Sequence, residues 1–179
     1  MQKLQLTLAI IKPYILKQPF ILEHVRNIIL ENDFKIILSK RVVLSQQMAE
    51  NFYREHKEKF FYNRLVTFMT SGASDVYILA RHDAIEYWRK LMGPTKVFRA
   101  QYSHPDSIRG KFGLSDTRNV SHGSDSPEKA REEIETFFPD FSVDKWMCEE
   151  EVSFRNNKIH FIKEDFKHIP LLEKVCLRS

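Results

Sequence analysis

The order of hydrophobic patterns along the chain predicts an α+β fold, a ferredoxin-like split βαβ sandwich with a four-stranded antiparallel sheet. Three segments have the alternating or short continuous apolar patterns of β-strands, at 4–10, 34–44 and 76–80. Segments with apolar residues at helical spacing lie between these strands. We expect the fourth strand at 117–120, immediately before another strong helical pattern.

The first strand has an apolar residue at every second position: Leu4, Leu6, Leu8 and Ile10. Lys12 continues the same parity, so its side chain would leave the core face of the sheet where the strand ends. A lysine in that place is unusual unless it meets an anion. Pro13 follows and ends the strand.

Helical patterns follow the first two strands. An amphipathic helix is expected over 21–29, and Ser45 would cap a segment whose helical spacing reaches His56. The pattern at 60–69 continues as another helix, which a Ser-Gly pair ends.

The region after the third strand changes from helical to aperiodic. Asp83 would cap a helix that Gly93 closes. Residues 95–113 then show no period and are rich in Arg, Gly and Pro, so we expect a long loop there. A loop of that length in a compact domain is usually functional.

The segment 118–126, Arg-Asn-Val-Ser-His-Gly-Ser-Asp-Ser, is the most informative part of the sequence. It places His122 beside two small residues, Gly123 and Ser124, which would let the phosphate of a ligand approach the imidazole closely. A histidine in such a setting is a nucleophile, an acid/base group or a metal ligand. The ordinary alternative is a surface or turn residue.

A well-marked helix follows this histidine. Ser126 is a good N-cap and Pro127 suits the first helical position. Glu133 falls on the flank of the apolar face, and a carboxylate near a buried face needs a partner. His122 could be that partner, and so could a nearby Lys or Arg; the spacing alone does not decide. The apolar face comprises Ala130, Ile134, Phe137 and Phe138.

The bulk composition predicts one globular domain, with room for an appendage. The 179 residues fit a single domain, and 42% hydrophobic with 29% charged residues is ordinary for a soluble globular chain. A net charge of +4 suits anionic small ligands but does not establish nucleic-acid binding. Two cysteines make no disulfide framework, which indicates a reducing compartment. We expect no secretory signal, no transit peptide and no membrane span.

From about residue 4 to 141 the chain resembles the nucleoside diphosphate kinases. Their N-terminal signature appears as Ile11-Lys12-Pro13, and their active-site signature is complete at 118–126. The stretches at 92–95 and 107–110 are similar to the family's phosphate-binding loop. Residues 93–95, 105–109 and 116–118 look most like the nucleoside diphosphate kinase 6 branch. The resemblance implies a kinase-like domain at 1–149 and a C-terminal extension at 150–179.

The resemblance implies a phosphotransferase with a ping-pong mechanism. His122 would attack the γ-phosphate of a nucleoside triphosphate and pass it, as phosphohistidine, to a nucleoside diphosphate. Glu133 would hydrogen-bond the other ring nitrogen. Tyr53 would lie near the transferred phosphate, and Phe61 would stack on the base. The residues that would hold phosphates and ribose are Lys12, Arg89, Thr95, Arg109 and Asn119.

Mg²⁺ is the implied cofactor, bridging phosphate oxygens and held mainly by the nucleotide and water, with no protein ligand assigned. The branch resembled also implies a mitochondrial location, with the cytoplasm as the alternative. Three assigned residues have ordinary alternatives as well. Arg89 could be a solvated helix residue, Thr95 a turn residue and Phe61 part of the core.

The sequence departs from the family pattern in three places. Tyr14 stands where the family usually has Asp, and the 95–109 loop is about three residues longer than usual. That loop supports trimer contacts in the family, so a smaller oligomer than the usual hexamer is expected. The C-terminal extension would form a docking helix or a mobile end. Its short apolar face would comprise Phe166, Ile169, Leu172, Val175 and Cys176.

Two other functions fit the sequence. A catalytically weak relative could serve as a protein-interaction module through the C-terminal extension. A ferredoxin-like RNA-binding domain is compatible with the mild basicity, but the strands lack the paired aromatic residues that such domains use for stacking. We therefore expect no specific nucleic-acid partner.

Overall fold

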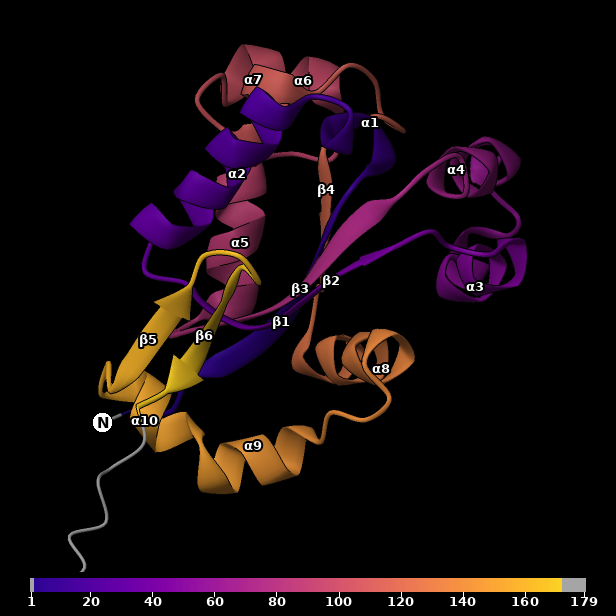
Figure 1. Cartoon of the computed structure of the whole chain (residues 1–179). Coiled ribbons are helices and arrows are strands. Elements are labelled where there is room, and N and C mark those ends of the chain that lie inside the picture. Colours follow the sequence, from indigo (N-terminus) through magenta and orange to yellow (C-terminus); the bar gives the residue numbers. More distant parts are fainter. Residues whose placement is uncertain (1, 172–179) are drawn as a thin grey trace, which may run out of the picture.

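A four-stranded antiparallel sheet forms the centre of the molecule, as the sequence predicted (Figure 1). The computed structural model describes residues 2–171. The strands lie in the order β2-β3-β1-β4. Their bounds are β1 Gln5–Ile11, β2 Lys35–Val42, β3 Ser74–Arg81 and β4 Ser121–Gly123. Both inner strands are fully buried at nearly every position, because helices cover both faces of the sheet.

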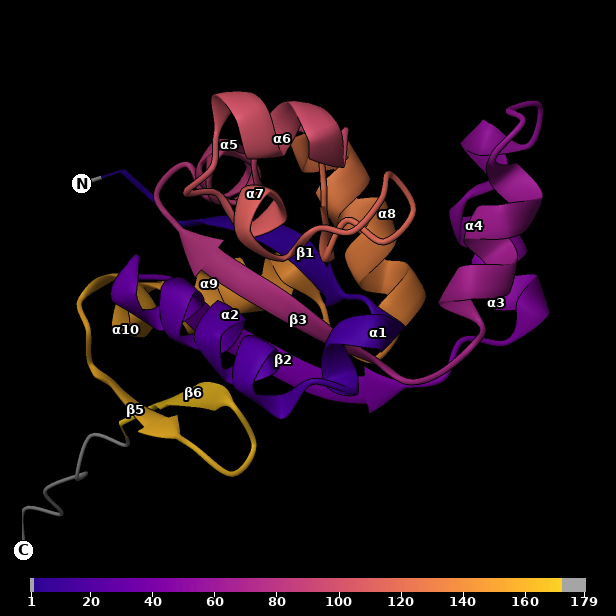
Figure 2. The same ribbon diagram turned by 90° about the horizontal axis from the view of Figure 1, so that it is seen from above.

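The helices form two groups, one against each face of the sheet. One face is covered by α1 Pro13–Leu16, α2 Pro19–Glu31 and α5 Ala84–Met92. The other face is covered by α8 Pro127–Phe137 and α9 Val143–Glu149. Helices α3 Gln46–Phe52 and α4 Tyr62–Met69 form a pair that stands to one side of the sheet, joined by the 3-10 turn Arg54–His56 (Figures 1 and 2).

Strand β1 supplies both cores through its alternating side chains. Leu8 and Ile10 belong to the core under α8, while Ala9 and Ile11 belong to the core under α2 and α5. The predicted parity of this strand is therefore confirmed. Within residues 2–171, no helix is both long and apolar enough to cross a membrane.

The cap predictions were right at three positions and wrong at one. The hydroxyl oxygens of Ser45 and Ser126 accept hydrogen bonds from the backbone of the first turns of α3 and α8. Gly93 ends α5 with φ 79°, where a side chain is disfavoured. Asp83 stands at the N-cap of α5 but makes no capping bond, because its backbone adopts the left-handed conformation with φ 54°.

The prediction of a loop at 95–113 was wrong, because two short helices occupy most of it. These are α6 Val97–Ser103 and α7 Ile108–Phe112. Each is too short to produce a recognisable period. Helix α6 buries Val97 and Ala100, and α7 buries Ile108 and is capped by Ser107. Gly110 is required by close packing, since a Cβ atom there would lie 2.3 Å from the carbonyl oxygen of His104.

The fourth strand lies after the predicted position of 117–120. Strand β4 is Ser121–Gly123, so His122 itself is a strand residue, paired with Ile10 of β1. Val120 has φ 74°, a strained conformation for a β-branched residue, and it turns the chain into the sheet. The β-like composition before His122 therefore belongs to a bend.

The C-terminal extension is not a docking helix over its described part. After α10 Glu151–Arg155, strands β5 Ile159–Ile162 and β6 Lys167–Pro170 form an antiparallel hairpin beside the edge strand β2 (Figure 2). His168 accepts a hydrogen bond at Nδ1 from the backbone N–H of Ile36 at 2.9 Å. Phe166, in the left-handed conformation with φ 46°, inserts its ring into the core below α2.

Part of the apolar face expected in the C-terminal extension lies outside the described residues. Ile169 is 40% exposed, and the positions 172, 175 and 176 of the expected apolar face lie outside the described range. Glu151, which is buried, accepts a hydrogen bond from the backbone N–H of Leu4 at 2.9 Å. The described extension thus packs on the core, and the division at 149/150 stays a prediction.

Candidate active site

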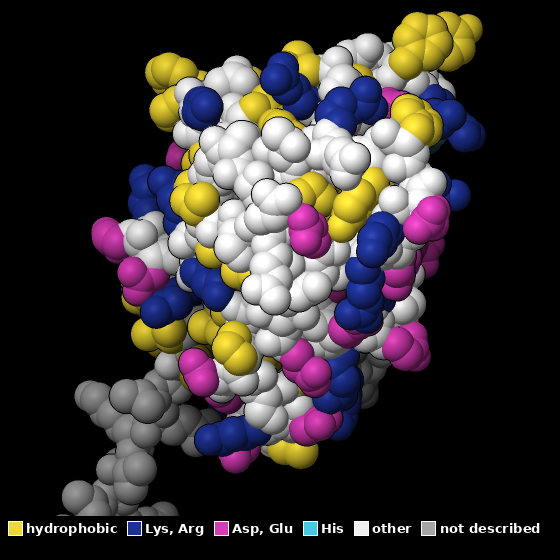
Figure 3. All heavy atoms as spheres, turned by 90° about the vertical axis from the view of Figure 1, so that its right-hand side faces the viewer, with side chains coloured by type: hydrophobic (Ala, Val, Ile, Leu, Met, Phe, Trp, Pro, Cys, Tyr) yellow, Lys and Arg dark blue, Asp and Glu magenta, His cyan; other side chains and the backbone are white. Residues whose placement is uncertain are grey.

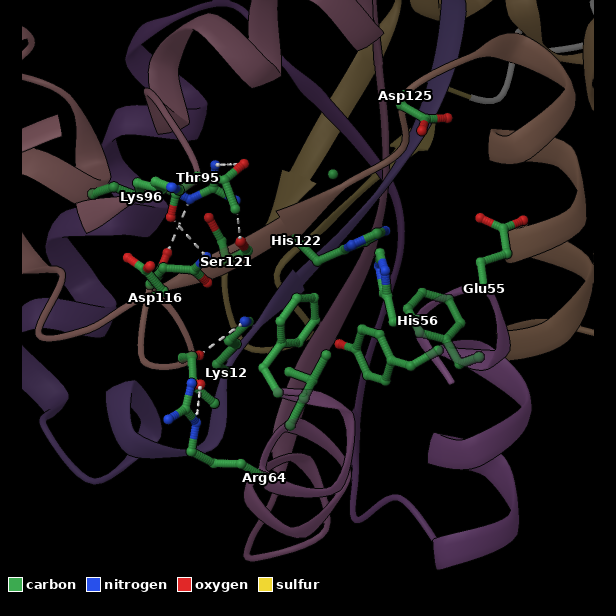
Figure 4. A pocket seen from close by; sticks show the side chains of 18 of the residues that line it. Lys12, Glu55, His56, Arg64, Thr95, Lys96, Asp116, Ser121, His122 and Asp125 are labelled. Carbon is green, nitrogen blue, oxygen red and sulfur yellow. Dashed lines mark hydrogen bonds between the residues drawn. The ribbon is translucent and has the colours of Figure 1, made fainter. Parts of the chain in front are cut away.

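One pocket of about 490 Å³ opens between the edge of the sheet, the α3–α4 pair and the loop before α6 (Figure 4). It collects residues that are far apart in the sequence. All nine residues named from the sequence line it: Lys12, Tyr53, Phe61, Arg89, Thr95, Arg109, Asn119, His122 and Glu133.

The imidazole of His122 is hydrogen-bonded to a buried carboxylate. Its Nε2 lies 2.9 Å from Oε1 of Glu133, a residue that is 4% exposed on the inner face of α8. The hydroxyl of Ser124 donates to the other carboxylate oxygen of Glu133 at 2.6 Å. Of the two partners that the spacing allowed for Glu133, the fold provides the histidine. With Nε2 engaged, Nδ1 is the ring nitrogen without a hydrogen bond to any described residue.

The backbone around His122 is tightly packed. The indole N–H of Trp88 donates to the carbonyl oxygen of His122 at 3.2 Å. A Cβ atom at Gly123 would lie 2.5 Å from the Trp88 ring, so only glycine fits beside the histidine. The ring of Phe52 packs edge-on against the imidazole with 5.1 Å between centroids. These contacts fix the direction of the ring.

Two buried cations stand at the inner end of the pocket. Lys12 is 5% exposed and donates from Nζ to the carbonyl oxygen of Thr117 at 3.0 Å. Arg109 is 7% exposed and donates to the carbonyl oxygens of Asn119, Gly93 and Ser121. Neither cation forms an ion pair with a carboxylate of the described residues. Buried charges without counter-ions are costly, so this end is prepared for an anion.

Burial and repulsion from a nearby arginine lower the pKa values of both cations. Burial, together with repulsion from Arg109, lowers the pKa of Lys12 to about 7. Burial, together with the nearby Arg89, lowers the pKa of Arg109 to about 10. A bound phosphate would reverse both effects by favouring the charged forms.

Three buried polar atoms in the pocket have no hydrogen-bond partner among the described residues: Tyr53 OH, Asn119 Oδ1 and Ser121 Oγ. Buried polar atoms are normally satisfied, so a group of unsatisfied ones in one cavity indicates a ligand site. Burial, and then the charge of Glu133, raises the pKa of Tyr53, which keeps its hydroxyl protonated and able to donate.

The two ends of the 95–109 segment lie close together. Arg109 Nη1 lies 3.5 Å from Thr95 Oγ1, and Asn119 donates from Nδ2 to the carbonyl oxygen of Thr95 at 3.2 Å. Helices α6 and α7 lie between the two ends of this segment. The stretches at 92–95 and 107–110 therefore lie beside each other at the pocket.

Tyr14, an expected departure from the family pattern, has a structural role. Its hydroxyl lies 3.0 Å from the carbonyl oxygen of Phe112 and 2.9 Å from that of Arg118. It thereby ties α1 to α7 and to the start of the histidine motif. Burial raises the pKa of this hydroxyl, so it remains a donor.

Several residues at the pocket mouth were not predicted from the sequence. Glu55 and Lys129 form an ion pair at 2.6 Å across this mouth. His56, Arg64 and Asp116 also line the pocket. Arg64 follows Phe61 by three positions on a predicted helix, so helical spacing was the one signal that could have pointed to it. Figure 3 shows the face that lies on the right in Figure 1, where apolar and basic side chains stand together along the upper edge.

The residues of the pocket fit a metal ion that is bound to a ligand better than one that is held by protein side chains. Within the described residues, no group of three or more His, Cys, Asp or Glu side chains could hold a metal ion. Glu133 is already engaged by His122 and Ser124. Asp125 is a carboxylate at the rim near His122 that could face a metal-bound water (Figure 4).

Comparison with known proteins gave consistent matches. The family described as Nucleoside diphosphate kinase matches residues 5–143. The chain is 53% identical to Nucleoside diphosphate kinase 6 of Mus musculus over 167 residues, covering 93% of this chain and 88% of the relative. It is also 53% identical to Nucleoside diphosphate kinase 6 of Danio rerio over 165 residues, covering 92% and 94%. The crystal structure of the Aquifex aeolicus nucleoside diphosphate kinase superposes with a TM-score of 0.72 at 34% identity, covering 78% of this chain and 96% of that one.

Proposed function

The chain belongs to the nucleoside diphosphate kinase family, and from that premise we propose that it is an active nucleoside diphosphate kinase. It would transfer the γ-phosphate of a nucleoside triphosphate to a nucleoside diphosphate. The observation that carries the proposal is the state of His122. One ring nitrogen is held by Glu133, and the other has no described partner in a pocket with two unpaired buried cations.

The covalent step follows from this geometry. The Nδ1 lone pair of His122 attacks the γ-phosphorus, and the bond between this phosphorus and the β–γ bridging oxygen breaks. The bridging oxygen leaves with its electron pair on the nucleoside diphosphate. In the second half-reaction a terminal β-phosphate oxygen of the acceptor attacks the phosphohistidine, and the electron pair of the P–N bond returns to Nδ1. Glu133 orients the ring and stabilises the charge on it in both directions.

The phosphates would occupy the cationic end of the pocket. Lys12 and Arg109 are there with fixed directions, since each is already bonded to backbone carbonyl oxygens. The unsatisfied hydroxyl of Tyr53 would donate to the transferred phosphate. Arg89, Thr95 and Asn119 complete the set that would hold phosphates and ribose, and Phe61 at the mouth would stack on the base.

Mg²⁺ fits as a companion of the nucleotide. Bound to the phosphate oxygens and water, it would neutralise part of their charge. The protein would contribute the cations and the exclusion of bulk water, with Asp125 at the rim.

Phosphorylation of His122 is the direct test. The whole protein, incubated with γ-labelled ATP and Mg²⁺, should give an acid-labile, base-stable phosphoprotein. His122→Phe should lose this label completely, while the matched variant His82→Phe, changed at an exposed position outside the pocket, should keep it. Full labelling of His122→Phe would mean that another residue is the nucleophile. No labelling of the unmodified protein would favour the catalytically weak alternative.

A further inference from the structure

We propose that Arg64 and Asp116 contact the edge of the nucleobase and make the pocket prefer guanine over adenine nucleotides. The inference rests on the proposed function, because it places the phosphates at the cationic end and the base at the mouth beside Phe61. Neither residue is needed for the phosphoryl transfer itself. Both would select among its substrates.

Arg64 is anchored with most of its donors free. It stands on α4, one turn after Phe61, and its Nε donates to the hydroxyl of the buried Thr117 at 3.1 Å. A guanidinium group has five N–H donors in a rigid fork. The other four donate to no described residue. Thr117 in turn accepts from Lys12 through its carbonyl oxygen, which links Arg64 to the fixed inner end of the pocket.

Asp116 presents the complementary chemistry. Its Oδ1 accepts a hydrogen bond from the backbone N–H of Val97 at 3.1 Å, which fixes the carboxylate. Its Oδ2 accepts from no described residue, and Asp116 and Arg64 do not form an ion pair with each other. Both side chains lie on the side of the cavity opposite Glu55 and His56 (Figure 4). A donor fork and an acceptor thus flank one end of the pocket.

This pair of groups matches the hydrogen-bonding edge of guanine. Guanine offers acceptors at O6 and N7, which a guanidinium reads well, and donors at N1 and N2, which a carboxylate can accept. Adenine has an amino group in place of O6 and a lone pair in place of the N1–H. An adenine stacked on Phe61 would therefore oppose donor to donor and acceptor to acceptor, which disfavours it. A pyrimidine is smaller, so we expect it to engage one of the two groups at a time.

A purely structural role for Arg64 makes a different prediction. If it only fixes the segment around Thr117, its loss would weaken all nucleotides equally and lower the melting temperature. The ratio of affinities for two bases is therefore the informative quantity, because a structural defect does not change it.

The test compares GDP and ADP binding to the whole protein by calorimetry. We expect the unmodified chain to bind GDP about tenfold more tightly than ADP, the size expected for a charge-assisted hydrogen bond. Arg64→Gln keeps a donor for Thr117 but removes the fork, and Asp116→Asn keeps an oxygen for Val97 but removes the charge. Each variant should bring the GDP/ADP affinity ratio toward one. Arg99→Gln, an exposed position on α6 outside the pocket, is the matched control and should leave the ratio unchanged.

The outcomes separate the two proposals. Equal affinity of the unmodified protein for GDP and ADP, with normal labelling of His122 by both triphosphates, overturns the base preference and leaves the kinase proposal standing. A ratio that neither Arg64→Gln nor Asp116→Asn changes also overturns it. No binding of either nucleotide overturns the proposed function and this inference together. Should Arg64→Gln fail to fold, Asp116→Asn decides by itself.

Discussion

The inner end and the mouth of the pocket are built from different kinds of structure. At the inner end, Lys12, Arg109 and Glu133 are buried, and each is fixed by bonds to the backbone or to another buried group. At the mouth, Arg64 and Asp116 are exposed and each is held by one bond. The contrast teaches that fixed charges for transferring a phosphate need burial, whereas recognition of the base needs free donors and acceptors.

The inner end also carries a cost that the mouth does not. Two desolvated cations near each other destabilise the folded chain until an anion arrives. The stability of the fold alone would therefore not favour two cations at the inner end of the pocket. The predictions below test whether the two ends are as different as their structures indicate.

Among replacements of the residues compared at the two ends of the pocket, that of Glu133 should give the largest effect. Glu133→Gln would remove the charge that orients His122 and stabilises its cationic form, so labelling by ATP should slow on the order of a hundredfold or more. Nucleotide affinity, which depends on other residues, should change little. Single-turnover labelling and calorimetry measure the two separately. An unchanged labelling rate would leave Glu133 as a structural residue.

Replacing one residue at each end should distinguish phosphate from base recognition. Arg109→Met should weaken ATP binding by about 1.5–3 kcal/mol, the cost of a lost charge-assisted contact, and leave adenosine binding nearly unchanged. Phe61→Ala should weaken both by about 1–3 kcal/mol, since stacking concerns the base alone. Calorimetric titration with ATP and adenosine provides the comparison. Equal losses for the two ligands in Arg109→Met would contradict a role at the phosphates.

The titration of Lys12 should change the stability of the folded chain, and the sign of this change is defined. Its pKa in the folded chain is about 7 against an ordinary 10.5, so between these values the unfolded chain binds the extra proton. The free energy of unfolding without nucleotide should therefore gain a contribution from Lys12 that rises with pH over this window. Affinity for ATP should fall as pH rises above about 7, because Lys12 then loses its charge.

Lys12→Met serves as the reference for this effect. Denaturant unfolding at pH 7 and pH 9.5 should show a rise in stability for the unmodified chain relative to Lys12→Met. A relative fall over the same window would contradict the buried, uncompensated state of this lysine.

The sequence predicted the sheet and the helices with strong periodic patterns. It did less well where elements are short or strained. Helices α6 and α7 have too few turns to show a period, and β4 begins one residue after Val120, whose left-handed backbone no local pattern announces. The C-terminal hairpin was missed because its one deeply buried aromatic, Phe166, lies in a turn rather than on a strand.

By itself, the sequence determined the parity of the first strand, the caps at Ser45 and Ser126, and the histidine motif that relates the chain to its family. These are local features, fixed by the preferences of adjacent residues. For Glu133 the spacing left two partners open and only the family resemblance pointed to His122, which the structure places beside it. Tertiary structure alone decided that Arg64 and Asp116 share one end of the pocket and that a hairpin packs beside β2. Such contacts depend on how helices and strands pack across long stretches of chain, and spacing along the sequence does not contain that information.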